Sequence, residues 1–216
     1  TKKSELQPKA KFSFKSRKQK TTPKPTVVIK PKETGKEHVS DATVLIKDQS
    51  DKILRLDQSK ECMDVLLSDL TRCIVILDSE KAISAVHMKN IRDCILFCGS
   101  IDGSLLVYGI SHSVLVVGCH QLRIHDAHHL DILMHVTSRP IIEDSHNIST
   151  GKFNNQENTV NYFDQVEDFN WLKKQMSPNW KTMENDRLET LVQAIEILKS
   201  DEGLTKLSTF LPTKES

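Results

Sequence analysis

Residues 64–73 read DVLLSDLTRC and residues 85–94 read AVHMKNIRDC, and each segment runs into a short apolar stretch, CIVIL from Cys73 and CILFC from Cys94. Similar segments return at 105–114 (LLVYGISHSV), 121–132 (QLRIHDAHHLDI) and 139–148 (RPIIEDSHNI). Coils beginning at Cys73, Cys94 and Val114 are 21, 20 and 18 residues long, whereas a strand with a crossover helix needs roughly 30. The repeat therefore predicts a mainly β fold, a right-handed parallel β-helix of stacked short strands.

Aligned positions of the repeats form two apolar columns that we expect to face the interior. One column is Val65, Val86, Leu106, Leu122 and Pro140, and the other is Leu67, Met88, Tyr108, Ile124 and Ile142. Because side chains alternate along a strand, the residues between the columns should point outward: Leu66, His87, Val107, Arg123 and Ile141. Apolar spacing at 60–70 also fits a helix, but the match to the repeat favours a strand there.

Arg123 is the candidate functional residue, exposed on a rigid strand. Gln121 and His125 share its outward face, and Glu143 lies beside His125 on the next coil. We interpret these polar groups, together with the apolar Val107 and Ile141 beside them, as a surface for docking a partner. The alternative from the residues alone is that Arg123 is an ordinary solvated surface charge.

The two ends of the chain differ from the repeats. Residues 1–36 carry twelve Lys or Arg against two Glu and four of the seven prolines, which predicts a disordered basic arm. Its function is either attraction to an acidic surface or nucleic acid, or simply linkage to a preceding segment. The β-helix is expected over residues 37–150, with the C-terminal part of that domain over 151–185.

Two helices are expected after the repeats, because the apolar strands need a cover on their other face. In Asp164–Met176, apolar residues at helical spacing predict a covering helix: Val166, Phe169, Leu172 and Met176. The last region, 186–216, should hold an amphipathic helix and a tail. That helix spans residues 186–199, starts with a capping box at Asp186 and Glu189, and stops before Gly203. It either packs on the β-helix or binds a partner.

Several kinds of chemistry have no matching pattern. The five cysteines form no C-x-x-C pair, which argues against a zinc finger and against a disulfide framework. Histidines cluster near one turn without a standard ligand spacing, and CGSIDG at 98–103 lacks the lysine of a phosphate-binding loop. We therefore expect no metal, no cofactor and no active site for substrate turnover. A cytoplasmic protein that does not enter a membrane fits this composition.

Several segments together resemble the tubulin-folding cofactor C family. They are QLRIH (121–125), VTSRPIIED (136–144), EDFNWL (167–172) and SPNW (177–180), with KFSFKSRK (11–18) similar to the basic motif ahead of that domain and DVLLSDL (64–70) similar to its entry. The resemblance covers about residues 61–181, and the combination is specific to the family. It implies the β-helix of the cofactor C-like domain.

The resemblance also implies a function. Cofactor C acts with cofactors D and E to stimulate GTP hydrolysis by β-tubulin and to release native αβ-tubulin. The resemblance implies that Arg123 is an arginine finger and that Gln121 and Glu143 assist it. A monomer associated with the cytoskeleton follows, with no nucleic acid as partner. Two alternatives stay open: activation of an Arf-like small GTPase, and a β-helix that binds a partner without catalysis.

Overall fold

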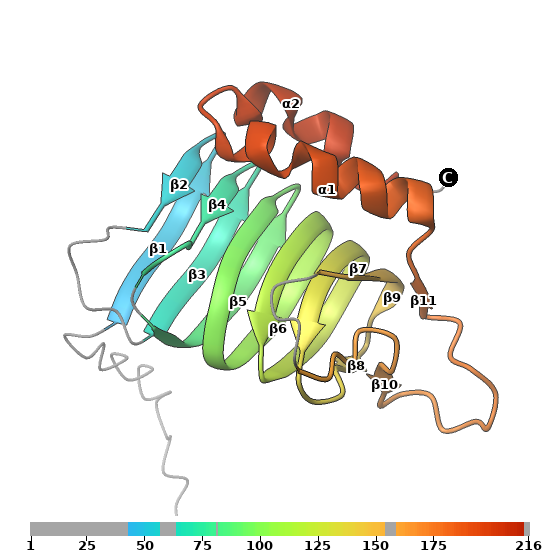
Figure 1. The fold of residues 1–216 in the computed structure, drawn as a ribbon. Helices are drawn as coiled ribbons and strands as arrows, with labels where there is room; N and C mark the ends of the chain where they lie inside the picture. Colours follow the sequence, from blue (N-terminus) through green and yellow to red (C-terminus); the bar gives the residue numbers. More distant parts are fainter. Residues whose placement is uncertain (1–42, 57–63, 81, 154–158, 214–216) are drawn as a thin grey trace, which may run out of the picture. The chain divides into compact units, whose positions relative to one another are not determined.

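The fold is a stack of parallel β coils with two helices along one side (Figure 1). The computed structural model describes residues 43–56, 64–80, 82–153 and 159–213. The predicted basic arm, residues 1–36, lies outside them. The strands are β1 (Thr43–Ser50), β2 (Ile53–Arg55), β3 (Asp64–Thr71), β4 (Ile74–Ile76), β5 (Ile83–Arg92), β6 (Ile95–Cys119), β7 (Gln121–Val136), β8 (Ile141–Glu143), β9 (His146–Lys152), β10 (Glu167–Asp168) and β11 (Trp180–Thr182).

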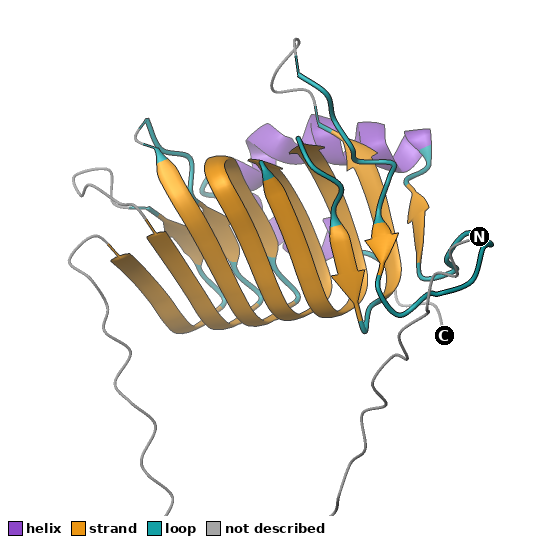
Figure 2. Cartoon of the chain, turned by 90° about the horizontal axis from the view of Figure 1, so that it is seen from below, coloured by secondary structure: helices purple, strands orange, loops and turns teal. Residues whose placement is uncertain are grey.

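The strand order confirms the predicted parallel β-helix. Along one side the strands pair in parallel in the order β1-β3-β5-β6-β7-β8-β10. A second run pairs β2 with β4, β4 with β6, β7 with β9 and β9 with β11. The long strands β6 and β7 bend around the stack and belong to both runs (Figure 2). The coils begin at β1 and continue through β11, beyond the predicted limit at residue 150.

Each bend between the two runs uses residues in the left-handed backbone conformation, at stacked positions from coil to coil. Asp69, Asn90 and Asp126 occupy one such position with φ of 55°, 54° and 58°. Asp and Asn adopt this conformation more readily than most residues. Gly109 completes the row between Asn90 and Asp126, with a φ of 77°. These residues therefore fix where each coil turns.

The predicted inward columns are right in four coils and wrong in the third. Strand β6 pairs Leu105 with Val86 and Val107 with Met88, so Leu105 and Val107 face the core and are 0% and 1% exposed. Leu106 and Tyr108, which we expected inside, alternate with them on the outward face. The sequence could not decide between the two registers, because both faces of this strand carry large apolar side chains.

A β-bulge produces this one-residue shift. Ile83 pairs with Ile101, but Ala85 pairs with Ser104, so Asp102 and Gly103 together face Ser84. Gly103 is required there, since a Cβ atom would lie 2.4 Å from the Ser84 carbonyl oxygen. The third repeat consequently begins at Ser104 and not at Leu105.

The C-terminal helices cover the outer face of the β4–β6–β7 run. Helix α1 (Asn185–Lys199) and helix α2 (Gly203–Phe210) lie along the coils in Figure 1. Their apolar residues pack against the strands' second apolar face: Leu191, Ala194, Leu198 and Leu207 against Ile74, Ile95, Val114 and Leu133. Of the two roles left open for the 186–199 helix, the structure shows packing on the β-helix.

Details of these helices differ from the prediction. The N-cap of α1 is Glu184 and has no side-chain cap hydrogen bond, so Asp186 lies in the first turn and no capping box forms. The predicted tail contains α2, which begins at Gly203, the residue expected only to end the preceding helix.

The covering helix predicted at Asp164–Met176 is wrong. That segment forms the short strand β10 followed by turns. Its backbone pairs with the open edge of the last coil, where Phe169 N donates to the Ile142 carbonyl at 3.0 Å. Leu172 and Met176 are 94% and 80% exposed and cover nothing.

Candidate functional site

Arg123 projects from β7 between two buried neighbours, as its strand alternation predicts. Leu122 and Ile124 are fully buried at 0% exposure, whereas the Arg123 side chain is exposed. Parallel pairing places Arg123 beside Leu106 on one coil and beside Ile141 on the next. The arginine thus stands on a strand held rigidly from both sides.

The guanidinium of Arg123 has no hydrogen bond or ion pair among the described residues. Its closest recorded interaction is with an aromatic ring, since its Cζ lies 5.9 Å from the centre of the Phe169 ring. A cation over an aromatic face is held weakly, by about 0.5–1 kcal/mol at an exposed site. Within the described part of the chain, the charge is therefore oriented by the ring and has no anionic partner.

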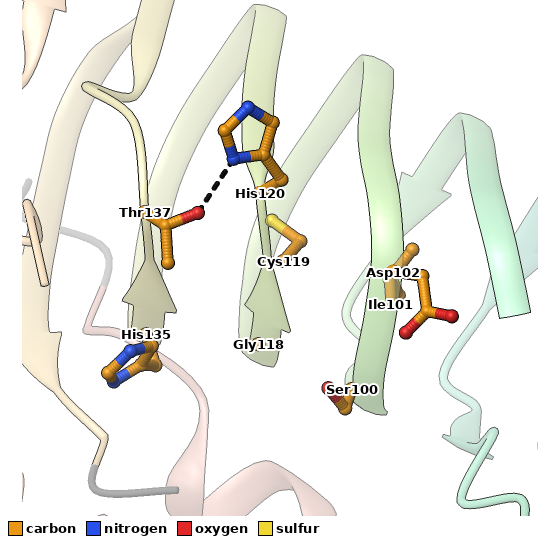
Figure 3. A pocket seen from close by; sticks show the side chains of 8 residues that line it. All are labelled: Ser100, Ile101, Asp102, Gly118, Cys119, His120, His135 and Thr137. Carbon is orange, nitrogen blue, oxygen red and sulfur yellow. Dashed lines mark hydrogen bonds between the residues drawn. The ribbon is translucent and has the colours of Figure 1, made fainter. Parts of the chain in front are cut away.

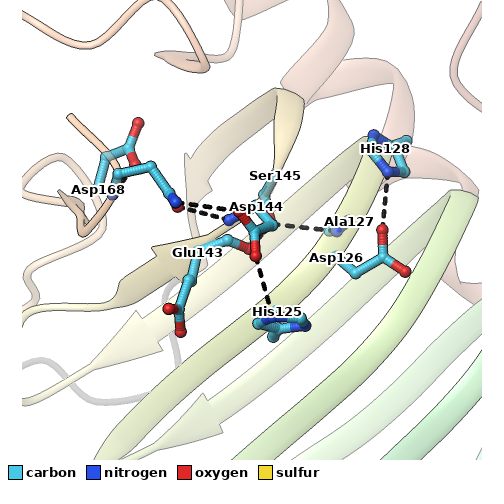
Figure 4. Close-up of polar contacts among 9 residues, drawn as sticks. His125, Asp126, Ala127, His128, Glu143, Asp144, Ser145 and Asp168 are labelled. Atoms are coloured by element: carbon cyan, nitrogen blue, oxygen red, sulfur yellow. Dashed lines mark hydrogen bonds and ion pairs between the residues drawn. The ribbon is translucent and has the colours of Figure 1, made fainter.

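The predicted polar neighbours share this face. Gln121 is exposed two residues before Arg123, and His125 follows two residues after it. Glu143 pairs with His125 across the β7–β8 edge, and its side chain extends from the strand without a contact among the residues drawn in Figure 4. An amide, a guanidinium and a carboxylate therefore lie on adjacent positions of two coils.

The prediction of Val107 as a partner-binding residue is wrong, because Val107 faces the core and is only 1% exposed. Leu106 takes its place beside Arg123. Tyr108, 53% exposed, lies beside His125 with ring centres 5.9 Å apart. Ile141 is half-buried at the position predicted for it. We call the outward residues of this region the Arg123 face: Leu106, Tyr108, Gln121, Arg123, His125, Ile141 and Glu143.

A hydrogen-bond network missing from the sequence prediction ties the Arg123 face to the segment after β10. Asp144 Oδ2 lies 3.1 Å from His125 Nε2, and Figure 4 draws this contact as a dashed line. Asn170 accepts a bond from the Asp144 amide at 2.6 Å and donates to the Asp144 carboxylate at 3.0 Å. In the sequence, the only signal for this network is the position of Asp144 in a turn. The network fixes Phe169, the neighbour of Asn170, close to Arg123.

Residues 62–185 match the sequence model of the family described as "Tubulin binding cofactor C". The matched span contains Arg123, Gln121, His125 and Glu143. The chain belongs to the tubulin binding cofactor C family.

Curated relatives agree with this family. Tubulin-specific chaperone C of Mus musculus is 30% identical over 83% of this chain and 60% of the relative. Tubulin-folding cofactor C of Arabidopsis thaliana is 32% identical over 87% of this chain and 59% of the relative. The chain spans about 60% of the length of these relatives. A solved structure, "Tubulin Binding Cofactor C from Leishmania major", covers 65% of this chain and 87% of that one at 18% identity, with a TM-score of 0.38.

Apart from the Arg123 face, this cofactor C family chain has a hollow lined by Ser100, Gly118 and His135 (Figure 3). His120 Nδ1 lies 2.7 Å from Thr137 Oγ1 at its rim. Cys119 lines it, but burial raises the pKa of the Cys119 thiol to about 12. The thiol is thus protonated at neutral pH and a poor nucleophile.

The described ranges also bear on metal ligands and on membrane-spanning helices. They contain no cluster of three His, Cys, Asp or Glu side chains arranged to hold a metal ion. Their helices are also too short or too polar to cross a membrane. Among the cysteines, a hydrogen bond with Cys94 lowers the pKa of Cys73 to about 7, yet both side chains are fully buried. Arg123 and its neighbours remain the best candidate site of this family member.

Proposed function

We propose that this chain is a GTPase activator of the tubulin-folding pathway, acting in trans. Arg123 supplies an arginine finger to the GTP of β-tubulin, in a complex with tubulin-folding cofactors D and E, and hydrolysis releases native αβ-tubulin. The observation that carries the proposal is the exposed guanidinium on a rigid strand, which forms no ion pair with any residue that the structure describes. The family and the names of the relatives, tubulin-specific chaperone C and tubulin-folding cofactor C, support tubulin as the partner.

The chemistry fits an arginine in particular. Phosphoryl transfer develops negative charge on the transferred group and the leaving oxygens, and an inserted guanidinium stabilises it, accelerating hydrolysis by about 10³–10⁵. Lysine is a hydrated point charge without the planar fork and substitutes poorly. Gln121, two residues before Arg123 on the same face, and Glu143, opposite His125 on the next coil, are the groups we assign to orienting the attacking water or the finger itself.

The proposal extends to the cellular setting. We place the chain in the cytoplasm, associated with the cytoskeleton through tubulin, as a monomer that turns over no substrate of its own. The GTP belongs to the partner.

Single-turnover GTP hydrolysis by tubulin with cofactors D and E tests the proposal. Arg123→Ala should reduce the stimulated rate by at least about 10³-fold, at the lower end of the range for an arginine finger, and Arg123→Lys should recover little of it. Arg72→Ala is the matched control, because Arg72 is also exposed but pairs with Asp51 at 2.5 Å, away from the Arg123 face. Full stimulation by folded Arg123→Ala would refute the arginine finger, whereas wild-type protein that binds tubulin without stimulating hydrolysis would indicate a binding module without catalysis.

A further inference from the structure

The loop after β10, residues 169–179, is built rigidly although it stands out from the coils (Figure 1). Asp168 closes its base: Oδ2 accepts bonds from Ser177 Oγ at 2.5 Å and Asn179 Nδ2 at 2.8 Å, and Oδ1 accepts one from the Asn170 amide at 3.0 Å. Within the loop, Trp171 Nε1 donates to the Gln175 carbonyl at 2.8 Å. We call this segment the Asp168 loop.

This ordered loop exposes large apolar side chains to water. Leu172 is 94% exposed and Met176 is 80% exposed, the two highest values among the exposed large hydrophobic residues of the described ranges. Two such side chains, held in water on a hydrogen-bonded loop, contribute no packing energy to the free protein. Exposed apolar groups of this kind mark a contact with another protein.

The charge of the loop indicates the chemistry of that contact. Residues 169–179 (FNWLKKQMSPN) contain Lys173 and Lys174 and no acidic residue. Lys173 stacks on Trp171, with its Nζ 4.6 Å from the ring centre. Lys174 is exposed next to it. An apolar tip flanked by cations complements an acidic surface that has an apolar pocket.

The Asp168 loop is continuous with the Arg123 face. Its first residue, Phe169, lies under the Arg123 guanidinium at 5.9 Å, and Asn170 connects it to Asp144 and so to His125. A protein that receives Arg123 therefore comes close to the base of the loop, because Phe169 lies against Arg123 and Asn170 is bonded to Asp144.

We propose that the Asp168 loop is a second docking element for the same GTPase, inserting Leu172 and Met176 into an apolar pocket on its acidic surface. This inference rests on the proposed function. In this proposal the loop increases the affinity for the partner, and Arg123 accelerates the hydrolysis step. Truncating the loop side chains should weaken binding without slowing hydrolysis in the assembled complex.

The test measures stimulated GTP hydrolysis by tubulin, with cofactors D and E, as a function of the concentration of this chain. Leu172→Ser with Met176→Ser should raise the half-saturating concentration at least about tenfold and keep the maximal rate. Arg123→Ala should instead lose the maximal rate and keep tubulin binding, measured by sedimentation. Val192→Ser with Ile197→Ser, on the exposed side of α1 at 44% and 37% exposure, is the control and should change neither quantity.

Charge reversal gives an independent readout. Lys174→Glu should weaken binding more at low salt than at high salt, because exposed charges are screened by ions. An unchanged half-saturating concentration for Leu172→Ser with Met176→Ser would overturn the docking role, as would a loss confined to the maximal rate. Wild-type protein that neither binds nor stimulates tubulin would overturn the proposed function, and the loop proposal with it.

Discussion

Removing Arg187 should destabilise the protein strongly, because Arg187 neutralises a carboxylate inside an apolar layer. Asp131 is 7% exposed on β7, and its Oδ2 accepts bonds from Arg187 Nε at 2.9 Å and Nη2 at 2.7 Å. The same Nη2 donates to the Phe210 carbonyl at 2.6 Å, so one side chain joins α1, the end of α2 and the coils. Arg187→Met leaves the carboxylate buried and unpaired.

The expected cost follows from burial. Breaking a buried ion pair typically costs about 3–5 kcal/mol. The Arg187 side chain is 27% exposed, so some water can reach Asp131 once it is gone. We therefore expect about 3 kcal/mol, the lower end of that range. With a urea dependence of about 2 kcal/mol per molar, the unfolding midpoint should fall by about 1.5 M.

Urea unfolding followed by circular dichroism measures this shift, with two comparison variants. Lys199→Met breaks the Lys199–Asp78 pair, whose side chains are 28% and 45% exposed, and should cost no more than about 1 kcal/mol. Replacing both buried partners, Asp131→Leu with Arg187→Met, should recover most of the loss, since no unpaired charge remains. Equal midpoints for Arg187→Met and Lys199→Met, or no recovery in the double variant, would refute the reasoning.

Two further predictions concern the β-bulge at Gly103 and the coil bend at Asp69. Gly103→Ala should lower the free energy of unfolding by roughly 3 kcal/mol or more, or prevent folding, because its Cβ would lie 2.4 Å from the Ser84 carbonyl oxygen. Gly118→Ala, whose Cβ would have its nearest atom at 3.6 Å, should lower it by less than about 1 kcal/mol. Thermal melts compare the two variants, and equal melting temperatures would contradict the bulge. The hydrogen bond from Asn90 lowers the pKa of Asp69. Ionised Asp69 therefore stabilises the folded state, and this stabilisation is lost as the pH falls through the pKa of Asp69 in the folded protein. Asn90→Ala should therefore raise the pKa of Asp69 toward its ordinary value, and a carboxyl titration by NMR that shows no rise would contradict this cause.

The repeat was a reliable guide to the fold wherever the two faces of a strand differ. In β5 and β7 the apolar inward positions alternate with polar or smaller ones, so the register follows from the pattern, and Arg123 is placed correctly. In β3 the outward Leu66 is apolar, but Asp64 and Ser68 on the same face mark that face as the outer one. In β6 the run LLVY is apolar on both faces, and the bulge at Gly103 leaves no mark in a pattern of hydrophobicity. The assignment of Val107 to the surface failed for that reason.

Helical spacing misled in one segment and succeeded in another because of what the backbone could pair with. Residues 164–176 follow the open edge of the last coil, and hydrogen bonds to Pro140 and Ile142 draw the chain into β10 before a helix can begin. Residues 185–199 pair with none of the described strands, and their apolar stripe meets the second apolar face of the coils. Spacing alone contains no information about a neighbouring edge.

The electrostatics of the free protein bear directly on whether Arg123 can act on a partner. Glu143 is exposed one coil away, yet neither it nor any other described carboxylate forms an ion pair with Arg123. The nearby Asp144 is engaged by His125 and Asn170, and Glu167 by Arg139 at 3.2 Å. An arginine finger already bound to an internal carboxylate would have to break that pair before reaching phosphate. By occupying the other acids with local partners, the fold keeps the Arg123 charge available, and the uncharged ring of Phe169 supports it without neutralising it.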